Sequence, residues 1–273
     1  MSNSLSVYVD SMLSRGKTYF SRAEAMVALK QSPEAFKKAS ARLIKKQRLA
    51  CPRRGFYLIL RPEDRAFGAP DPARWIGPLM KHLRVDYRIS LLRAAAFHGS
   101  SHQAAMVFQV IAPKQIHDFE IGRHRIQFIY QAPEAFKEAN RPEWLDAIKT
   151  DTGMAKVAGV ELTLLDSSRY FHKAAGINGL AQIVHDIGGK AKASALANAA
   201  MAYENSAVRR LGYLLDRFGH NRQAKVLHFF ADQAKSLKPL DPSARAIAPE
   251  LGRRAKRNSE WKLVVNTPVE IDA

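Results

Sequence analysis

Closely spaced cations are the most distinctive chemical feature of this sequence. The stretch FKKASARLIKKQRLACPRRGFYLI, residues 36–59, contains eight Lys or Arg among its 24 residues and no acidic residue. Side chains of one charge at this density raise the local concentration of polyanions and speed their capture. Two interpretations follow: a surface that binds an acidic partner such as nucleic acid, or the solvated face of an ordinary helix.

Helical periodicity separates the apolar side chains of this stretch from its cations. Plotted at about 100° per residue, Phe36, Leu43 and Ile44 share one side. The other side carries Lys37, Lys38, Arg42, Lys45, Lys46 and Arg48. A helix that is only solvated usually places Glu and Lys four residues apart, which stabilises the helix. In this predicted helix no acidic residue follows Glu34. Because a bound polyanion would relieve the repulsion among these cations, we predict a nucleic-acid-binding face.

Two helix-start signals position this face. Residues 21–24 (Ser-Arg-Ala-Glu) have the pattern of a capping box. Residues 32–34 (Ser-Pro-Glu) combine an N-cap, a proline at the first helical position and an acid in the first turn. Only one or two residues separate the two predicted helices, as in a helix-turn-helix. A further helix is expected at about residues 5–13.

A predicted hairpin follows the basic helix. Residues 49–60, LACPRRGFYLIL, combine two apolar segments with a Pro-Arg-Arg-Gly turn. Three helices followed by such a hairpin make a winged helix, in which the N-terminal residues of the second paired helix lie nearest the base edges of a major groove. The residues placed there are Lys37, Lys38, Ala41 and Arg42. Arg53 and Arg54, at the tip of the wing, are expected to reach a flanking phosphate or a narrow minor groove.

Charge distribution and turn signals predict two domains. The 273 residues carry a net charge of +18, and 47% of them are hydrophobic. Residues 1–65 hold 14 basic and 5 acidic side chains, which is half of the net charge. Prolines and a glycine in RPEDRAFGAPDPAR, residues 61–74, mark a boundary. We expect an α+β protein with a winged helix-turn-helix DNA-binding domain at residues 1–66 and a larger mixed α/β domain at residues 67–273.

The predicted second domain has strand-like patterns early and helical patterns late. Its basic residues predict a second contact surface for nucleic acid, an acidic protein or a nucleotide, with a solvated loop as the alternative. They are Arg209 and Arg210, expected to be exposed on a helix, and the loop-like run Arg253, Arg254, Lys256 and Arg257.

Residues that could perform catalysis or bind a metal do not combine into a site. His98 and His102 have the spacing of zinc ligands on a helix, but Gly99 ends the helix between them. Asp166 and its neighbouring serines are better explained by helix capping than by a catalytic triad. A single cysteine, Cys51, excludes an intramolecular disulfide and a cysteine-only zinc site. We expect no enzymatic activity, no metal and no cofactor.

The hydropathy pattern also bears on location. No apolar run approaches the ~20 residues that span a bilayer, and the first 30 residues lack the apolar core of a signal peptide. We therefore expect a cytoplasmic protein with no membrane partner.

Several segments together resemble the AbiEi family, the antitoxins of bacterial abortive-infection (AbiE) toxin–antitoxin pairs. In chain order, from about residue 20 to residue 272, they are CPRRGFYLI, YRISLLRAAAFHGSSHQ with MVFQV, VAGVELTLLDSSRYFHKAAGINGLAQIV, ENSAVRRLGYLLDRFG and WKLVVNTPVEID. The resemblance implies a winged helix that binds inverted repeats in double-stranded DNA upstream of its own operon and represses it. It also implies a C-terminal domain that neutralises a nucleotidyltransferase-like toxin in a type IV system, where no stable toxin–antitoxin complex is required.

Two other functions remain open from the sequence. One is a plain winged-helix transcriptional regulator whose C-terminal domain binds an effector or mediates dimerisation. The other is an enzyme that acts on nucleic acid and uses the winged helix as a tether. A neighbouring gene for a nucleotidyltransferase-like protein would favour the antitoxin, whereas the missing acidic or metal-ligand cluster counts against the enzyme.

Overall fold

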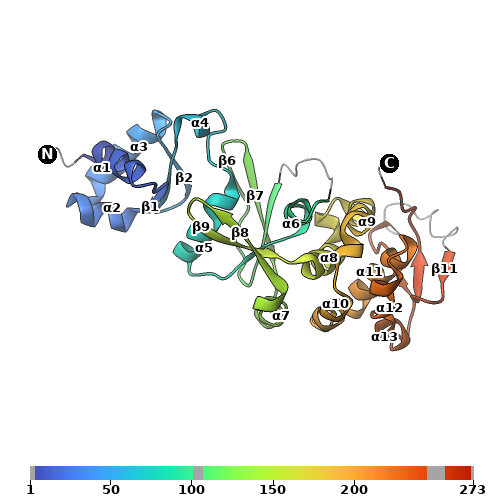
Figure 1. Cartoon of the computed structure of the whole chain (residues 1–273). Coiled ribbons are helices and arrows are strands. Elements are labelled where there is room, and N and C mark those ends of the chain that lie inside the picture. Colours follow the sequence, from blue (N-terminus) through green and yellow to red (C-terminus); the bar gives the residue numbers. More distant parts are fainter. Residues whose placement is uncertain (1–3, 101–106, 245–255, 272–273) are drawn as a thin grey trace. The chain divides into compact units, whose positions relative to one another are not determined.

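The chain forms two interleaved compact units in the computed structural model, which describes residues 4–100, 107–244 and 256–271 (Figure 1). Residues 1–88, 106–130 and 147–156 belong to the first unit, and residues 89–105, 131–146 and 157–273 to the second. The chain therefore passes between the units several times. The predicted limit of the DNA-binding domain at residues 66/67 falls inside the first unit and stays a prediction about function.

The first unit begins with three short helices, α1 (Leu5–Ser14), α2 (Arg22–Leu29) and α3 (Pro33–Lys45). Both predicted helix starts are confirmed. At α2 the amide of Glu24 donates to the Ser21 hydroxyl at 3.1 Å, and the Glu24 carboxylate accepts from the Ser21 amide at 2.7 Å. At α3 the Ser32 hydroxyl accepts from the amide of Ala35 at 3.3 Å.

A three-stranded antiparallel sheet accompanies these helices. Strands β1 (Tyr19–Ser21), β2 (Leu49–Arg53) and β3 (Phe56–Ile59) have the order β1-β3-β2. The hairpin predicted for residues 49–60 is confirmed, and Gly55 turns it with a φ of +85° that favours glycine. Strand β1 was not predicted, because three residues are too few to show an alternating pattern.

The helices and the sheet enclose a small apolar core. Its buried members are Leu5, Val9, Phe20, Ala25, Leu29, Phe36, Leu43, Leu49 and Ile59. Phe36 and Leu43 thus pack as predicted, but Ile44 does not. The residue is 40% exposed and is not among the members of this core.

A six-stranded sheet follows in the chain, with the order β6-β7-β5-β4-β9-β8. Strands β5 (Val107–Ala112) and β7 (His124–Tyr130) pair in parallel, and β6 (Phe119–Ile121) pairs antiparallel with β7. The other strands are β4 (Arg88–Ile89), β8 (Leu145–Thr150) and β9 (Gly153–Ala158), each with residues in both units. The segment before the sheet contains α4 (Pro62–Arg65), the 3₁₀ turn η1 (Pro72–Arg74) and α5 (Ile76–Leu83).

Helices dominate the second unit. Those of at least seven residues are α6 (Leu91–Phe97), α7 (Pro133–Ala139), α8 (Val160–Arg169), α9 (Gly176–Ile187), α10 (Ala193–Ala200) and α11 (Asn205–Arg217). Shorter turns are η2 (Pro142–Trp144), η3 (Phe171–Lys173), η4 (Gly188–Lys190), α12 (Asn221–Lys225) and α13 (His228–Asp232). None of the helices in the described ranges is long and apolar enough to cross a membrane.

A second small sheet ends the chain. It has the order β10-β12-β11, from β10 (Lys238–Pro239), β11 (Lys256–Asn258) and β12 (Leu263–Val265). The chain combines helices with three separate sheets, and helices α8–α13 follow the strands of the six-stranded sheet. The predicted α+β class, with an N-terminal helix and strand region before a larger α/β part, is therefore confirmed.

Candidate nucleic-acid interface

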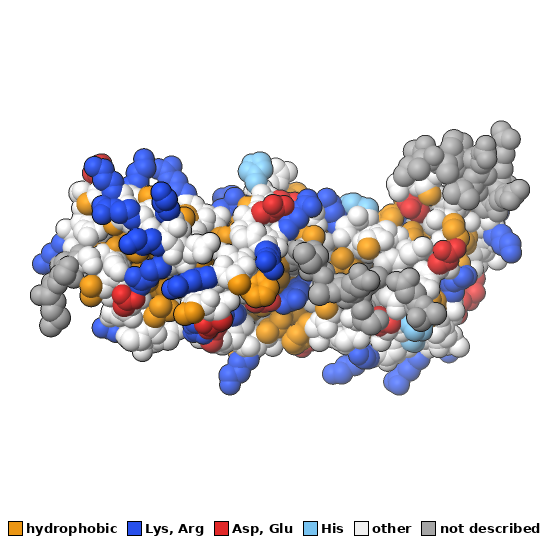
Figure 2. All heavy atoms as spheres, turned by 90° about the horizontal axis from the view of Figure 1, so that it is seen from above, with side chains coloured by type: hydrophobic (Ala, Val, Ile, Leu, Met, Phe, Trp, Pro, Cys, Tyr) orange, Lys and Arg blue, Asp and Glu red, His pale blue; other side chains and the backbone are white. Residues whose placement is uncertain are grey.

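The exposed side of α3 carries five cations. They are Lys37, Lys38, Arg42, Lys45 and Lys46. Within the described residues none of the five is held in an ion pair, so their charges face solvent. Figure 2 shows Lys and Arg side chains gathered over the N-terminal elements. The helix therefore concentrates positive charge on the side opposite the buried Phe36 and Leu43.

Arg48, the sixth cation predicted on this face, has a different place. Its Nη1 donates to the Ser6 hydroxyl at 2.7 Å, and its Nη2 forms an ion pair with Asp10. Both partners belong to α1. Arg48 therefore connects the residues just after α3 to α1, and its charge is partly compensated.

A groove separates α3 from the N-terminal turn of α1. It has a volume of about 710 Å³. Its lining residues are Ser4, Leu5, Ser6, Gln31, Glu34, Ala35, Lys38, Ala39, Arg42, Leu43, Lys46 and Arg48. Three of the five exposed cations of α3 thus line the groove, whereas Lys37 and Lys45 do not. No local sequence pattern predicts this groove, because its two walls come from segments about 30 residues apart.

The wing has one bound and one exposed arginine. The guanidinium of Arg53 lies 4.3 Å from the centroid of the Phe119 ring in β6, and its Nη2 donates to the carbonyl of His117. Burial at this contact lowers the pKa of Arg53. Arg54 is exposed. The two were predicted to be equivalent, because a cation–π contact across more than 60 residues leaves no local pattern.

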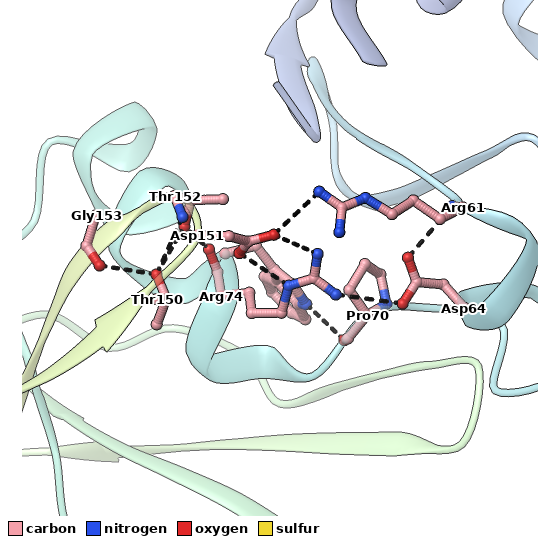
Figure 3. Close-up of polar contacts among 9 residues, drawn as sticks. Arg61, Asp64, Pro70, Arg74, Thr150, Asp151, Thr152 and Gly153 are labelled. Carbon is pink, nitrogen blue, oxygen red and sulfur yellow. Dashed lines mark hydrogen bonds and ion pairs between the residues drawn. The ribbon is translucent and has the colours of Figure 1, made fainter. Parts of the chain in front are cut away.

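Ion pairs connect residues of the segment that follows the β2–β3 hairpin (Figure 3). Asp151, in the turn between β8 and β9, accepts from Arg74 at 2.5 and 2.9 Å and from Arg61 at 3.2 Å. Arg74 also lies 3.4 Å from Asp64. Hydrogen bonding from Arg74 lowers the pKa of Asp151. The indole of Trp75 donates to the carbonyl of Pro70 at 2.9 Å. Residues 61–75 therefore form a fixed connection within the first unit.

Arg209 and Arg210 are not exposed, contrary to our prediction. Their side chains are buried, with 2% and 5% of each residue accessible. Arg210 donates to the carbonyls of Leu240 at 2.7 Å and Ser168 at 3.1 Å, and Arg209 donates to the carbonyl of Lys262 at 2.8 Å. Burial lowers the pKa of Arg210 to about 10. Their guanidinium groups satisfy backbone carbonyls inside the second unit, so they form no contact surface.

The second basic run is only partly described. Arg253 and Arg254 lie outside the described residues. Lys256 and Arg257 are exposed, and they lie in strand β11 rather than in the predicted loop. Antiparallel pairing of β11 with β12 gives Lys256 and Arg257 this extended conformation.

The residues considered for catalysis have structural partners. Asp166 is fully buried and accepts hydrogen bonds from the Ser90 hydroxyl at 2.6 Å and the Tyr203 hydroxyl at 2.7 Å. Nε2 of His98 lies 2.7 Å from the carbonyl of Ala158, and His102 lies outside the described residues. The described part of the chain contains no group of three or more side chains arranged to hold a metal ion.

Comparisons with known proteins bear on both units. Residues 88–217 match the family model described as the AbiEi antitoxin C-terminal domain. These residues are therefore similar to an AbiEi antitoxin domain. This confirms the resemblance found in the sequence motifs and supports a role as the antitoxin of a toxin–antitoxin system. AbiEi antitoxins are not an enzyme family.

The whole chain is also similar to a solved structure. The chain is similar to the crystal structure of the RV2827C protein from Mycobacterium tuberculosis, with a TM-score of 0.65 and 18% sequence identity. The match covers 94% of this chain and 89% of that one. At this identity the likeness shows the fold alone. No curated protein matches this chain.

Proposed function

We propose that this chain is an AbiEi antitoxin of a type IV system and that it also represses its own operon in the cytoplasm. The winged helix binds an inverted-repeat operator in double-stranded DNA. The C-terminal domain neutralises a nucleotidyltransferase-like toxin without a stable complex. No membrane takes part in either activity.

The observation that carries DNA binding is the unpaired charge of α3. Five exposed cations within ten residues repel one another, and nucleic-acid phosphates would relieve that repulsion while releasing counterions. Ser32 caps the end of α3 that a winged helix presents to base edges. The exposed Arg54 at the wing tip adds a contact to a flanking phosphate.

DNA binding is tested with the full chain and a duplex from the region upstream of its own reading frame. Lys37, Lys38 and Arg42 changed together to Ala should weaken binding at least tenfold, since each of these side chains contributes about 1 kcal/mol or more. Lys149→Ala, an exposed cation in β8, is the matched control and should bind as the wild type does. Unchanged binding by the triple variant would refute this role of α3.

The antitoxin activity is tested separately by co-expression with the neighbouring toxin gene. The full chain should restore growth. The triple variant of α3 should restore it equally well, if neutralisation belongs to the C-terminal domain and the toxin is supplied from an independent promoter. Absence of rescue by the folded wild-type chain would favour a plain transcriptional regulator.

A further inference from the structure

The groove beside α3 divides the exposed surface of this helix into two strips. The phosphate strip lines the groove and consists of Lys38, Arg42 and Lys46. These residues are four apart, so successive members lie about 40° apart around the helix and one above the other. The base strip lies outside the groove and consists of Lys37, Ala41, Ile44 and Lys45.

The phosphate strip faces a polar wall. Ser4 and Ser6 line the groove from the start of α1, where Ser4 caps the helix by accepting from the amide of Val7 at 3.4 Å. Arg48 also lines the groove and holds the Ser6 hydroxyl at 2.7 Å. Glu34 is the acid in the lining, at the opposite end of α3 from Lys46. The end of the groove near Lys46 is therefore the more positive one.

The base strip has a different chemistry. Ile44 is 40% exposed although it is apolar, and Ala41 is exposed and small. Apolar contact with a thymine methyl group is a direct means of reading a base in the major groove. A small residue allows the helix backbone to approach the base edges closely. Lys37 and Lys45 beside them supply donors for guanine O6 and N7.

We propose that the base strip reads sequence in the major groove while the phosphate strip, together with the start of α1, holds one strand's sugar–phosphate backbone. This inference rests on the proposed function and assigns its parts. It differs from the simple winged-helix expectation, in which Lys38 and Arg42 contact bases because they lie near the start of the helix. Here the groove wall directs them toward the backbone instead.

The two strips predict different effects on two probes. One probe is the promoter duplex from upstream of the reading frame, and the other is a scrambled duplex of equal length and base composition. Dissociation constants are measured by fluorescence anisotropy at several salt concentrations. Phosphate contacts affect both duplexes and the salt dependence, whereas base contacts affect only the promoter duplex.

Uncharged substitutions test the base strip. Ile44→Ala should raise the dissociation constant on the promoter duplex about threefold to tenfold, as expected when an apolar side chain no longer covers a base, and leave the scrambled duplex unchanged. Ala41→Leu adds bulk at an exposed site and should do the same by preventing close approach. Having two variants protects the test against a local defect in either, and thermal unfolding of each checks the fold. Equal effects on both duplexes, or none, overturn the assignment.

Charge substitutions test the phosphate strip. Lys38→Ala combined with Lys46→Ala should weaken both duplexes equally and lower the slope of log K against log salt by about 1.8, which is about 0.9 for each phosphate that is no longer neutralised. Lys149→Ala should change neither quantity. A weakening confined to the promoter duplex overturns the inference. If the wild-type chain binds both duplexes equally, the proposed function itself is refuted. If the wild-type chain prefers the promoter duplex but the two sets of variants have the same effects, only the division into two strips is refuted.

Discussion

The guanidinium of Arg53 lies 4.3 Å above the ring of Phe119 and thereby attaches the wing to strand β6. The same group donates to the carbonyl of His117. Its neighbour Arg54 has no such contact among the described residues and remains exposed. Two adjacent arginines with the same sequence environment therefore have different roles, one in positioning the wing and one available to a phosphate.

This difference predicts separate outcomes for the two arginines. Arg54→Ala should lower the salt slope of DNA binding by about 0.9, because one phosphate is no longer neutralised, and leave the unfolding temperature unchanged. Arg53→Ala should destabilise the first unit by about 1 kcal/mol through removal of the cation–π interaction and one hydrogen bond. Salt titrations and urea unfolding measure the two quantities. If Arg53→Ala lowered the salt slope as much as Arg54→Ala and left stability unchanged, the attachment of the hairpin to β6 through Arg53 would be contradicted.

Arg210 is predicted to stabilise the fold and not to bind a partner. Its replacement by Ala leaves the carbonyls of Leu240 and Ser168 without donors, at a cost of about 1–3 kcal/mol each before relaxation. We expect Arg210→Ala to lower the free energy of unfolding by about 2–4 kcal/mol. Lys256→Ala, at an exposed cation, is the control and should change it by less than about 0.5 kcal/mol. If Arg210→Ala kept full stability but no longer neutralised the toxin, Arg210 would instead act on the toxin.

The Asp151 cluster predicts a pH dependence of stability. Hydrogen bonding from Arg74 lowers the pKa of Asp151 below its ordinary value of 3.8, so the unfolded chain binds more protons at acidic pH than the folded chain. The stabilisation is complete above about pH 4 and is lost as the pH falls through the folded-state pKa. It should amount to less than about 1 kcal/mol, because the pair is partly exposed.

Urea unfolding between pH 5 and 2 measures this contribution. Asp151→Asn removes the titrating group, so the variant should be less stable than the wild type at pH 5 and converge toward it at the acidic end. A constant difference between the two proteins over that range would mean that Asp151 does not titrate differently in the folded state.

Gly212 in α11 is predicted to resist substitution. Glycine within a helix normally costs about 1 kcal/mol relative to alanine, so Gly212→Ala should stabilise an isolated helix. Here a Cβ at residue 212 would overlap the ring of the fully buried Trp261. We expect Gly212→Ala to destabilise the chain by about 1–3 kcal/mol. Combining it with Trp261→Leu should recover part of that stability, since the two side chains compete for one space. If the destabilising effects of Gly212→Ala and Trp261→Leu simply added, the overlap between a Cβ at residue 212 and the Trp261 ring would be contradicted.

Local signals in the sequence were sufficient to predict two N-terminal helix starts and the hairpin that follows them. The starts of α2 and α3 were predictable from residues 21–24 and 32–34, because a capping side chain bonds to an amide only three residues away. The hairpin after α3 was predictable because two short apolar segments flank a glycine turn. The α+β class followed from the order of strand-like and helical patterns.

Interactions between distant segments were decided only by the tertiary structure. Arg209 and Arg210 were expected in solvent, yet carbonyls 27 to 53 residues away accept their hydrogen bonds. The roles of Arg53 and Arg54 diverged for the same reason, since Phe119 is far from both in the chain. The groove beside α3 exists because the start of α1 forms its second wall. The exposure of Ile44 is likewise a result of packing. Amino-acid type and spacing thus determined which side chains are cationic and helical, whereas packing determined which of those cations are left free to bind.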